Sequence, residues 1–387
     1  MIPLSYNLRS IFRRRFSAVA TAGGLGLVVF VFAAVLMLSK GVEETLRSTG
    51  ARDNAIFLRK GSTSELTSFI PRDAAKVFAA DNAVAQEGGR AIASPELFVI
   101  FQLPRSDGNA TANVGLRGVT KDGWELLRSK TVHLVEGRPP QWATSEVMIG
   151  RATVGRYTGA RLGQSISIAR RQWQVVGVFE AGGSGFESEI WADADQIADA
   201  ARRTGYSTMT VKLKAASDLD GLQKTVDADP RYSLEAKRED KFYEESSGQL
   251  AAFIRVLGTV IAVFFSLGAT LGAMITMYAQ VASRVREVGT LRALGFRRRA
   301  VLGSFLIESL ILALLGAVAG CAFASLLGVT SFTTTNFSSF TEIKFRFHFA
   351  PDIALKATFF ALVMGLLGGL LPAVRAARLS IAEATKG

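Results

Sequence analysis

Four long stretches of uncharged, mostly apolar residues alternate with polar segments along the chain. Residues 16–39 and 256–283 carry no charge, and residues 300–329 carry one acid, Glu308. The fourth stretch lies at 357–374. Each is about as long as the roughly 20 apolar residues that a helix needs to cross a bilayer, or longer. With their flanks included, the predicted transmembrane helices are residues 16–39, 251–283, 300–329 and 353–374.

A polar block, residues 40–250, separates the first two spans. Short runs rich in β-branched and aromatic residues predict strands, and the segments 193–203 and 219–228 predict helices. A further predicted helix, 239–250, runs into the second span without a breaker. The block is therefore predicted to be a mixed α+β domain, or two subdomains. The predicted strands are 55–58, 97–103, 113–119, 147–149, 165–169, 173–179 and 208–213.

The chain has 387 residues, of which 49% are hydrophobic and 20% charged, with a formal net charge of +12. The three short flanks at 1–15, 284–299 and 375–387 hold thirteen basic and two acidic residues, whereas residues 40–255 hold 29 basic and 28 acidic ones. By the positive-inside rule, both termini and the 284–299 loop are cytoplasmic and the polar block is outside. The basic excess is thus a topogenic signal facing anionic lipid, which argues against nucleic-acid binding.

These assignments predict an α-helical membrane protein with four transmembrane helices and a large α+β extracytoplasmic domain between the first and second. Residues 1–15 form a cytoplasmic amphipathic segment, 284–299 a cytoplasmic loop, 330–352 a short extracytoplasmic loop, and 375–387 a cytoplasmic tail. The run Arg13-Arg14-Arg15-Phe16 is similar to an export signal. The apolar run that follows is longer than a signal-peptide core, so an uncleaved span is the better interpretation.

The sequence offers little catalytic chemistry. One cysteine and two histidines exclude a disulfide framework and leave almost no ligands for zinc. His133 and His348 are predicted to be structural. The segment Gly150 to Tyr157 has the spacing of a phosphate-binding loop but lacks its lysine and hydroxyl residue, so no ATPase activity is expected. A membrane-anchored enzyme with its active site in the outer block remains a weaker hypothesis.

The cytoplasmic loop 284–299 predicts a short amphipathic helix from about Val285 to Leu294. Helical spacing is expected to group Val288, Leu291 and Leu294, flanked by Arg286 and Glu287, and Gly295 suits a helix C-cap. Such a helix is either a docking element or an ordinary interfacial loop.

Polar and small residues within the spans suggest internal contacts. Glu308 is expected to lie about 13 Å up its helix from Arg299, at 1.5 Å per residue. A structural ion pair with the inner arginines or a cap to the cytoplasmic loop is favoured over a proton relay. Two ridges of small residues, Gly268-xxx-Gly272 and Gly316-xxx-Gly320, are expected to let helices pack closely within or between subunits.

Several of these residues form a pattern that resembles FtsX-like permeases, the membrane subunits of MacB-type ABC transporters. The pattern comprises Arg286-Glu-Val-Gly-Thr-Leu-Arg-Ala-Leu-Gly295, Phe305-Leu-Ile-Glu-Ser309, Gly316-Ala-Val-Ala-Gly320 and the tail Leu371-Pro-Ala-Val-Arg-Ala-Ala-Arg-Leu379. The outer block, from Gly118 through Arg138 to Val178, is similar to the periplasmic core domain of the family, so residues 40–250 are predicted to be a MacB-like core domain.

The resemblance implies a homo- or heterodimeric permease in the bacterial cytoplasmic (inner) membrane, working with an ATPase that binds ATP and Mg²⁺. The ATPase is expected to be a separate subunit, since about fifteen residues precede the first span, and this chain binds no cofactor. The implied mechanism is mechanotransmission, in which ATP-driven movement of coupling helices reaches the outer domains and an envelope substrate is exported or extracted. The implied coupling helix comprises Arg286, Glu287, Val288, Gly289, Leu291, Arg292, Ala293, Leu294 and Gly295.

Two further partners follow from the same resemblance. A periplasmic adaptor or membrane fusion protein is a possible partner of the outer domain. The alternative function is that of an FtsX-like regulator, in which the outer domain activates a cell-wall hydrolase and nothing is transported. An accumulated envelope substrate in a deletion strain indicates the first function, and a cell-separation defect the second.

Overall fold

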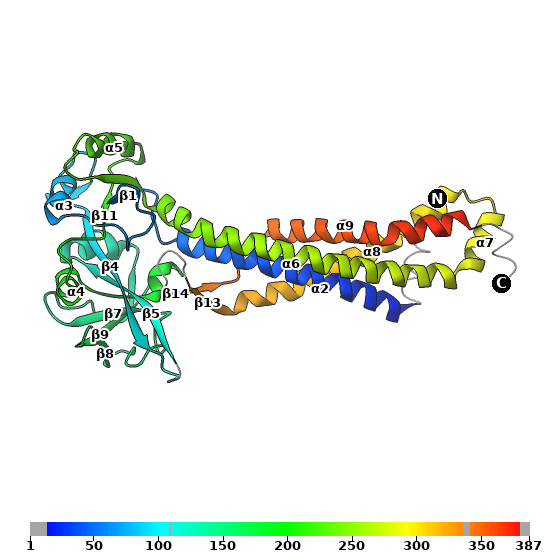
Figure 1. Ribbon diagram of the computed structural model, residues 1–387, viewed down its shortest axis with the longest axis horizontal. Helices are drawn as coiled ribbons and strands as arrows, with labels where there is room; N and C mark the ends of the chain where they lie inside the picture. The colour runs from blue at the N-terminus through cyan, green and yellow to red at the C-terminus, as the bar shows by residue number, and fades with distance from the viewer. Residues whose placement is uncertain (1–13, 109, 336–340, 380–387) are drawn as a thin grey trace. The chain divides into compact units, whose positions relative to one another are not determined.

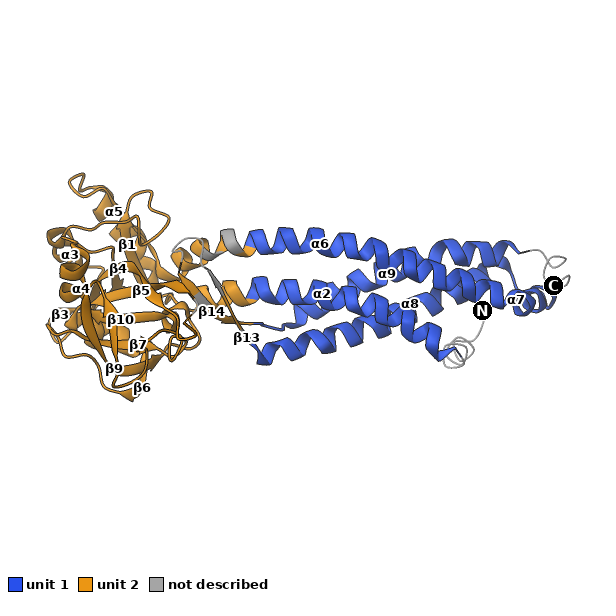
Figure 2. Ribbon diagram, turned by 60° about the horizontal axis from the view of Figure 1, so that its bottom comes forward, with its two compact units in different colours: residues 1–40, 252–330, 347–387 blue, residues 41–251, 331–346 orange. Residues whose placement is uncertain are grey.

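The computed structural model describes residues 14–108, 110–335 and 341–379 (Figure 1). Most of the predicted segment 1–15 and residues 380–387 of the predicted tail therefore lie outside the described residues. The chain divides into two compact units: residues 1–40, 252–330 and 347–387 form unit 1, and residues 41–251 and 331–346 form unit 2 (Figure 2).

Unit 1 is built from the four apolar helices. They are α2 (Arg15–Arg47), α6 (Glu239–Ser283), α8 (Arg298–Leu326) and α9 (Pro351–Arg378), and all four are long and apolar enough to cross a membrane. This confirms the predicted fold class. A short helix, α7 (Val285–Ala293), follows α6. Helices α2 and α6 each extend into unit 2, which contains α2 from Gly41 onward and α6 up to Ala251.

Small side chains dominate the contacts between these helices. The core of unit 1 includes Ala33, Ala313, Ala317 and Ala361, each with no exposed surface, together with Leu25 and Val29. Alanine and glycine let helix backbones approach closely, which stabilises helix pairs where lipid provides no hydrophobic driving force.

Unit 2 is one compact unit built on a ten-stranded mixed sheet with helices. The strand order is β12-β1-β11-β4-β5-β10-β7-β9-β6, and β8 pairs with β9. The β5–β10 and β7–β9 pairs are parallel and the other pairs are antiparallel. The bounds are β1 Asn54–Arg59, β4 Ala93–Pro104, β5 Thr111–Val119, β6 His133–Gly137, β7 Glu146–Gly150, β8 Ser165–Ile168, β9 Arg171–Glu180, β10 Glu189–Asp193, β11 Thr208–Lys212 and β12 Leu234–Arg238.

The two faces of this sheet are covered differently. Helices α3 (Arg72–Ala79), α4 (Ala194–Ala201) and α5 (Leu219–Asp227) pack on one face. The other face carries Trp191, Phe186 and Trp124, and it packs against Phe242 and Tyr243 from the first turns of α6. The start of the long helix is therefore part of the core of unit 2.

All seven predicted strands coincide with strands of the sheet, and both predicted helices occur, at Ala194–Ala201 and Leu219–Asp227. The predicted helix 239–250 is the first part of α6, which is one continuous helix of 45 residues (Figure 1). Elements that were not predicted include β10, β12, helix α3, the small pair β2 (Gln86–Glu87) and β3 (Arg90–Ala91), and the hairpin β13 (Ser331–Thr335) and β14 (Glu342–Arg346).

Candidate functional site

The C-terminal end of α6 leads directly into the short helix α7. Helix α6 ends at Ser283, Arg284 interrupts it, and α7 begins at Val285. Gly295 has a φ of 93°, the left-handed conformation expected of a glycine C-cap. The predicted helix and its cap are therefore present at this position, and its role as a coupling helix stays a prediction.

The predicted apolar face of α7 is wrong in one respect. Val288 is buried against Met277, Val281 and Phe305, but Leu294 is 72% exposed. Helix α7 ends at Ala293, and at 3.6 residues per turn Leu294 lies about 120° around the helix from Val288. The three apolar residues thus divide between an inward contact and an outward one.

A buried ion pair holds this turn against α8. The Arg284 guanidinium donates to the Glu308 carboxylate at 2.8 Å and to Glu287, in the first turn of α7, at 2.9 Å. The side chains of Arg284 and Glu308 are 5% and 3% exposed, and Arg284 also lies over the Phe305 ring. The structure therefore places Glu308 in an ion pair that links α8 to the turn before α7.

The two predicted glycine ridges have different surroundings. A Cβ atom on Gly320 would lie 2.5 Å from the carbonyl oxygen of Gly26 on α2, and one on Gly316 would lie 2.7 Å from that of Ala22. This ridge allows α8 to approach α2 closely within the chain. A Cβ on Gly268 or Gly272 would meet nothing within 4 Å, so that ridge makes no close contact within the described residues.

The N-terminal end of α6 lies in a buried network of charged side chains. Glu239, the first residue of α6, is fully buried. It accepts hydrogen bonds from Arg128 at 2.7 Å, from the Asn54 amide at 2.8 Å and from the backbone N–H of Ala51 at 3.0 Å. The chain that leaves α2 is close by, since a Cβ on Gly50 would lie 2.6 Å from the Glu239 backbone.

Arg117, on β5, is the centre of the same network. Its guanidinium donates to Glu96 and Glu65 at 2.7 Å each and to Glu189 at 2.7 and 2.9 Å. Glu96 also accepts from Arg128 at 2.5 Å, which joins the two arginines. We call these six residues the charge network: Glu65, Glu96, Arg117, Arg128, Glu189 and Glu239.

The charge network contains four carboxylates and two guanidinium groups, so acids are in excess. Burial raises the pKa of Glu189, and the negative charge of Glu65 adds to this rise, although Arg117 opposes both. Burial also acts to raise the pKa of Glu96, but there Arg128 and Arg117 outweigh it and the pKa is lowered. Of these two carboxyl groups, Glu189 therefore keeps its proton more readily than Glu96.

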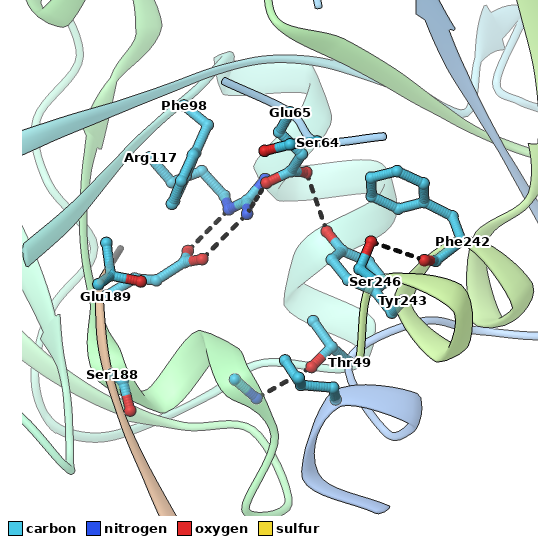
Figure 3. A pocket seen from close by; sticks show the side chains of 13 residues that line it. Thr49, Ser64, Glu65, Phe98, Arg117, Ser188, Glu189, Phe242, Tyr243 and Ser246 are labelled. Carbon is cyan, nitrogen blue, oxygen red and sulfur yellow. Dashed lines mark hydrogen bonds and ion pairs between the residues drawn. The ribbon is translucent and has the colours of Figure 1, made fainter. Parts of the chain in front are cut away.

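The network borders a pocket of about 560 Å³, its open mouth included (Figure 3). Glu65, Arg117 and Glu189 form its polar wall, where dashed lines join them in Figure 3, and the Tyr243 hydroxyl donates to Glu65 at 3.0 Å. The other lining residues come from the end of α2 and the turn after it, the loop after β1, strand β4, the turn before β10, the start of α6 and the segment preceding β14; they are Leu46, Thr49, Ser64, Phe98, Gly185, Ser188, Phe242, Ser246 and Thr341.

Sequence reasoning did not identify the charge network. A charged residue inside the apolar strand run Val114-Gly-Leu-Arg-Gly118 is a signal that a buried cation lies there. The carboxylates that neutralise it cannot be identified from the sequence, because the block contains 28 acidic residues and nothing in the sequence distinguishes the partners from the others. His133 and His348 are both exposed, and among the described residues no three His, Cys, Asp or Glu side chains are arranged so that they could hold a metal ion.

Comparison with known proteins gives two matches to family models. A model described as FtsX-like permease C-terminal matches residues 259–381, and one described as MacB-like periplasmic core domain matches residues 18–229.

Several curated proteins are similar over most of this chain. The macrolide export ATP-binding/permease protein MacB of Brucella abortus is 26% identical over 389 residues, which cover 92% of this chain and 56% of that protein. The Escherichia coli protein of the same name is 24% identical over 408 residues, covering 96% and 58%. The chain spans little more than half the length of these relatives.

Among solved structures, the periplasmic region of MacB from Actinobacillus actinomycetemcomitans is similar with a TM-score of 0.38 and 12% identity, over 52% of this chain and 94% of that chain. The extracellular domain of the noncanonic ABC-type transporter YknZ from Gram-positive bacteria is similar with a TM-score of 0.35 and 11% identity, over 48% and 99%.

Proposed function

The chain belongs to the family of FtsX-like permeases with a MacB-like periplasmic core domain, a family of ABC-transporter membrane subunits, and we propose that it couples ATP hydrolysis by a separate ATPase to export or extraction of an envelope substrate by mechanotransmission. It is a multi-pass protein of the inner membrane. In the proposed orientation both termini and α7 are cytoplasmic and unit 2 is outside.

The observation that carries the proposal is the construction of α6. One helix of 45 residues begins at Glu239 in the charge network of unit 2 and ends at Ser283, next to the Arg284–Glu308 pair. Buried charge pairs with good geometry resist separation, because each partner left alone inside the protein would be strongly destabilising. A helix held in this way at both ends is suited to carry a displacement from α7 to the outer domain.

Helix α7 is the proposed contact for the ATPase. Arg286, Thr290, Ala293 and Leu294 are exposed, whereas Val288 and Gly289 are buried inside unit 1. The partner ATPase would supply ATP and Mg²⁺ chemistry. We place a second permease copy, identical or related, against α6, where Gly268 and Gly272 leave the backbone accessible. An adaptor on the outer domain belongs to the same proposal.

The test is a mild-detergent pull-down of the tagged protein from its native host. Leu294→Asp changes an exposed apolar side chain and leaves the Arg284–Glu308 ion pair intact. We therefore expect it to abolish recovery of a Walker-motif ATPase. The matched control is Val77→Asp, at a 48% exposed valine on helix α3 of unit 2, which should leave recovery unchanged. Equal recovery with both variants would remove α7 as the docking element.

The same preparation separates transport from regulation. Co-purification of an ATPase with an adaptor or envelope substrate supports transport, whereas co-purification with a cell-wall hydrolase supports the FtsX-like alternative.

The orientation in the membrane is measured with single cysteines in a Cys321→Ala background. We expect a membrane-impermeant maleimide to label Ser217→Cys, exposed in unit 2, and to spare Ala293→Cys, exposed on α7. The reverse labelling would invert the topology.

A further inference from the structure

The segment between α8 and α9 is a hairpin that belongs to unit 2. Strands β13 and β14 pair antiparallel, and residues 331–346 group with the outer domain rather than with the helices that they connect. A two-stranded hairpin is at best marginally stable alone, so its order depends on what it packs against. Phe345 on β14 is 4% exposed and Thr341, just before it, is 5% exposed.

Glu342, the first residue of β14, is held by two arginines of the outer domain. Its two carboxylate oxygens accept from Arg105 at 2.7 Å and from Arg156 at 2.6 Å, and the Tyr157 hydroxyl donates at 3.3 Å. The Glu342 and Arg156 side chains are 17% and 18% exposed. These distances are those of charge-assisted hydrogen bonds, which are stronger than neutral ones.

Backbone hydrogen bonds hold together the two segments that carry Arg105 and Arg156, the arginines that bind Glu342. The loop after β4 and the turn that carries Arg156 are joined by hydrogen bonds from the Ser106 N–H to the Arg156 carbonyl at 2.8 Å and from the Thr158 N–H to the Pro104 carbonyl at 2.9 Å. Arg105 and Tyr157 form a bridge between the same segments. The Lys344 N–H also donates to the Ser188 hydroxyl at 3.1 Å.

The connections from the hairpin to the helices are short. The helical turn after α8 ends at Val329 and β13 begins at Ser331, while β14 ends at Arg346 and α9 begins at Pro351. One residue and four residues therefore join the hairpin to its two helices. Since a chain spans at most about 3.3–3.6 Å per residue, these connectors leave little slack.

We propose that the docked hairpin is a second transmission route, with Glu342 as its positioning residue, which ties α8 and α9 to the outer domain in parallel with α2 and α6. This inference rests on the proposed function, because a route for motion matters only if ATP hydrolysis drives one. Thr341 also lines the pocket that Glu189 borders, so movement of the hairpin would reshape the wall of that pocket.

The first experiment measures docking in the full-length chain alone. Ser188→Cys and Lys344→Cys in a Cys321→Ala background place a thiol on each of two residues that meet where the Lys344 N–H donates to the Ser188 hydroxyl at 3.1 Å. We expect efficient cross-linking on mild oxidation and a several-fold lower rate after Glu342→Lys. The matched control is Glu146→Gln, which removes a 15% exposed carboxylate from Arg138 in the same domain but far from the hairpin in the chain. An unchanged rate in Glu342→Lys would show that Glu342 does not seat the hairpin and would overturn the proposal.

The second experiment measures transmission in the complex with its co-purified ATPase. Spin labels at Asp220→Cys in the two permease copies report the distance between outer domains in nucleotide-free and vanadate-trapped states. We expect Glu342→Lys to retain the ATPase but to reduce the nucleotide-driven shift several-fold, whereas Glu146→Gln retains the full shift. A full shift in Glu342→Lys would overturn the second route while the proposed function stands. If no ATPase co-purifies with the unsubstituted chain, the proposed function fails and the route fails with it, although the cross-link still reports docking.

Discussion

The two units of this protein bury different kinds of residue. The core of unit 1 is formed mainly of alanine, glycine and aliphatic side chains, and Gly320 lies against the α2 backbone. Unit 2 buries Trp173 and Trp191 together with the fully enclosed guanidinium groups of Arg117 and Arg128. The hydrophobic effect does not drive helices together in lipid, so close packing of the helix backbones stabilises unit 1. A water-exposed domain can instead enclose large side chains and a satisfied polar network.

Removing an arginine should have the largest effect in unit 2. Arg117→Met leaves Glu65, Glu96 and Glu189 buried with less compensation, and we expect a loss of about 3–5 kcal/mol of unfolding free energy. The four tryptophans, at 124, 142, 173 and 191, all lie in unit 2, so tryptophan fluorescence during urea unfolding reports this unit. The counterpart Arg284→Met should leave that transition in place, and equal shifts would contradict the separation of the units.

Small residues should matter most in unit 1. Gly320→Ala forces a methyl group to within 2.5 Å of a backbone oxygen, so we expect a loss of about 1–3 kcal/mol. Gly272→Ala is the matched control on α6, where nothing lies within 4 Å. Reaction of Cys321 on α8 with a thiol-reactive dye during heating reports unit 1. Equal midpoints for the two variants would contradict the close α2–α8 contact.

The pH dependence of unit 2 should reveal the excess of carboxylates. The pKa of Glu189 is raised on folding, so the folded state holds its proton more tightly than the unfolded state. Its contribution is fully present below the ordinary glutamate pKa of 4.5 and is lost as the pH rises through the higher, folded pKa. Glu96, with a lowered pKa, acts in the opposite direction and loses its contribution as the pH falls.

Glu189→Gln should therefore reduce the loss of unit 2 stability that occurs as the pH rises from 4.5 through the folded pKa of Glu189. The stability is measured by tryptophan fluorescence during urea unfolding across a pH series. A variant that follows the unsubstituted protein at every pH would show that Glu189 is not the proton-holding group. Unit 1 serves as the internal reference, since the same substitution should leave the Cys321 dye midpoint unchanged.

The smallest effect is expected at an exposed ion pair of unit 1. Lys40 and Asp352 meet at 2.7 Å, but their side chains are 37% and 48% exposed. Solvent screens such pairs, so Lys40→Ala should change the unfolding free energy by less than about 1 kcal/mol. A shift in the Cys321 dye midpoint as large as that of Gly320→Ala would show that this pair is more important than its exposure indicates.

Much of the architecture can be predicted from the amino-acid sequence alone. The four spans, the outer domain, seven strands and the α7 helix follow from composition and spacing within short contiguous segments. Strand β10 escapes prediction because its run, Glu189-Ile-Trp-Ala-Asp, is short and flanked by acids. The hairpin β13–β14 occupies a segment predicted to be a loop, because its stability comes from the domain beneath it rather than from its own residues.

For the charged residues, the sequence predicts which ones need a partner, but only the tertiary structure identifies the partner. That Glu308 should find a partner, and that a short helix should follow Arg284, can be inferred from burial in an apolar stretch and from local periodicity. Which groups meet cannot be inferred: Glu308 pairs with a residue 24 positions away, Glu239 with one 111 away and Glu342 with one 237 away. Hydrophobic periodicity acts over one or two helical turns and is readable along the chain, whereas an ion pair depends on where folding brings two distant segments together.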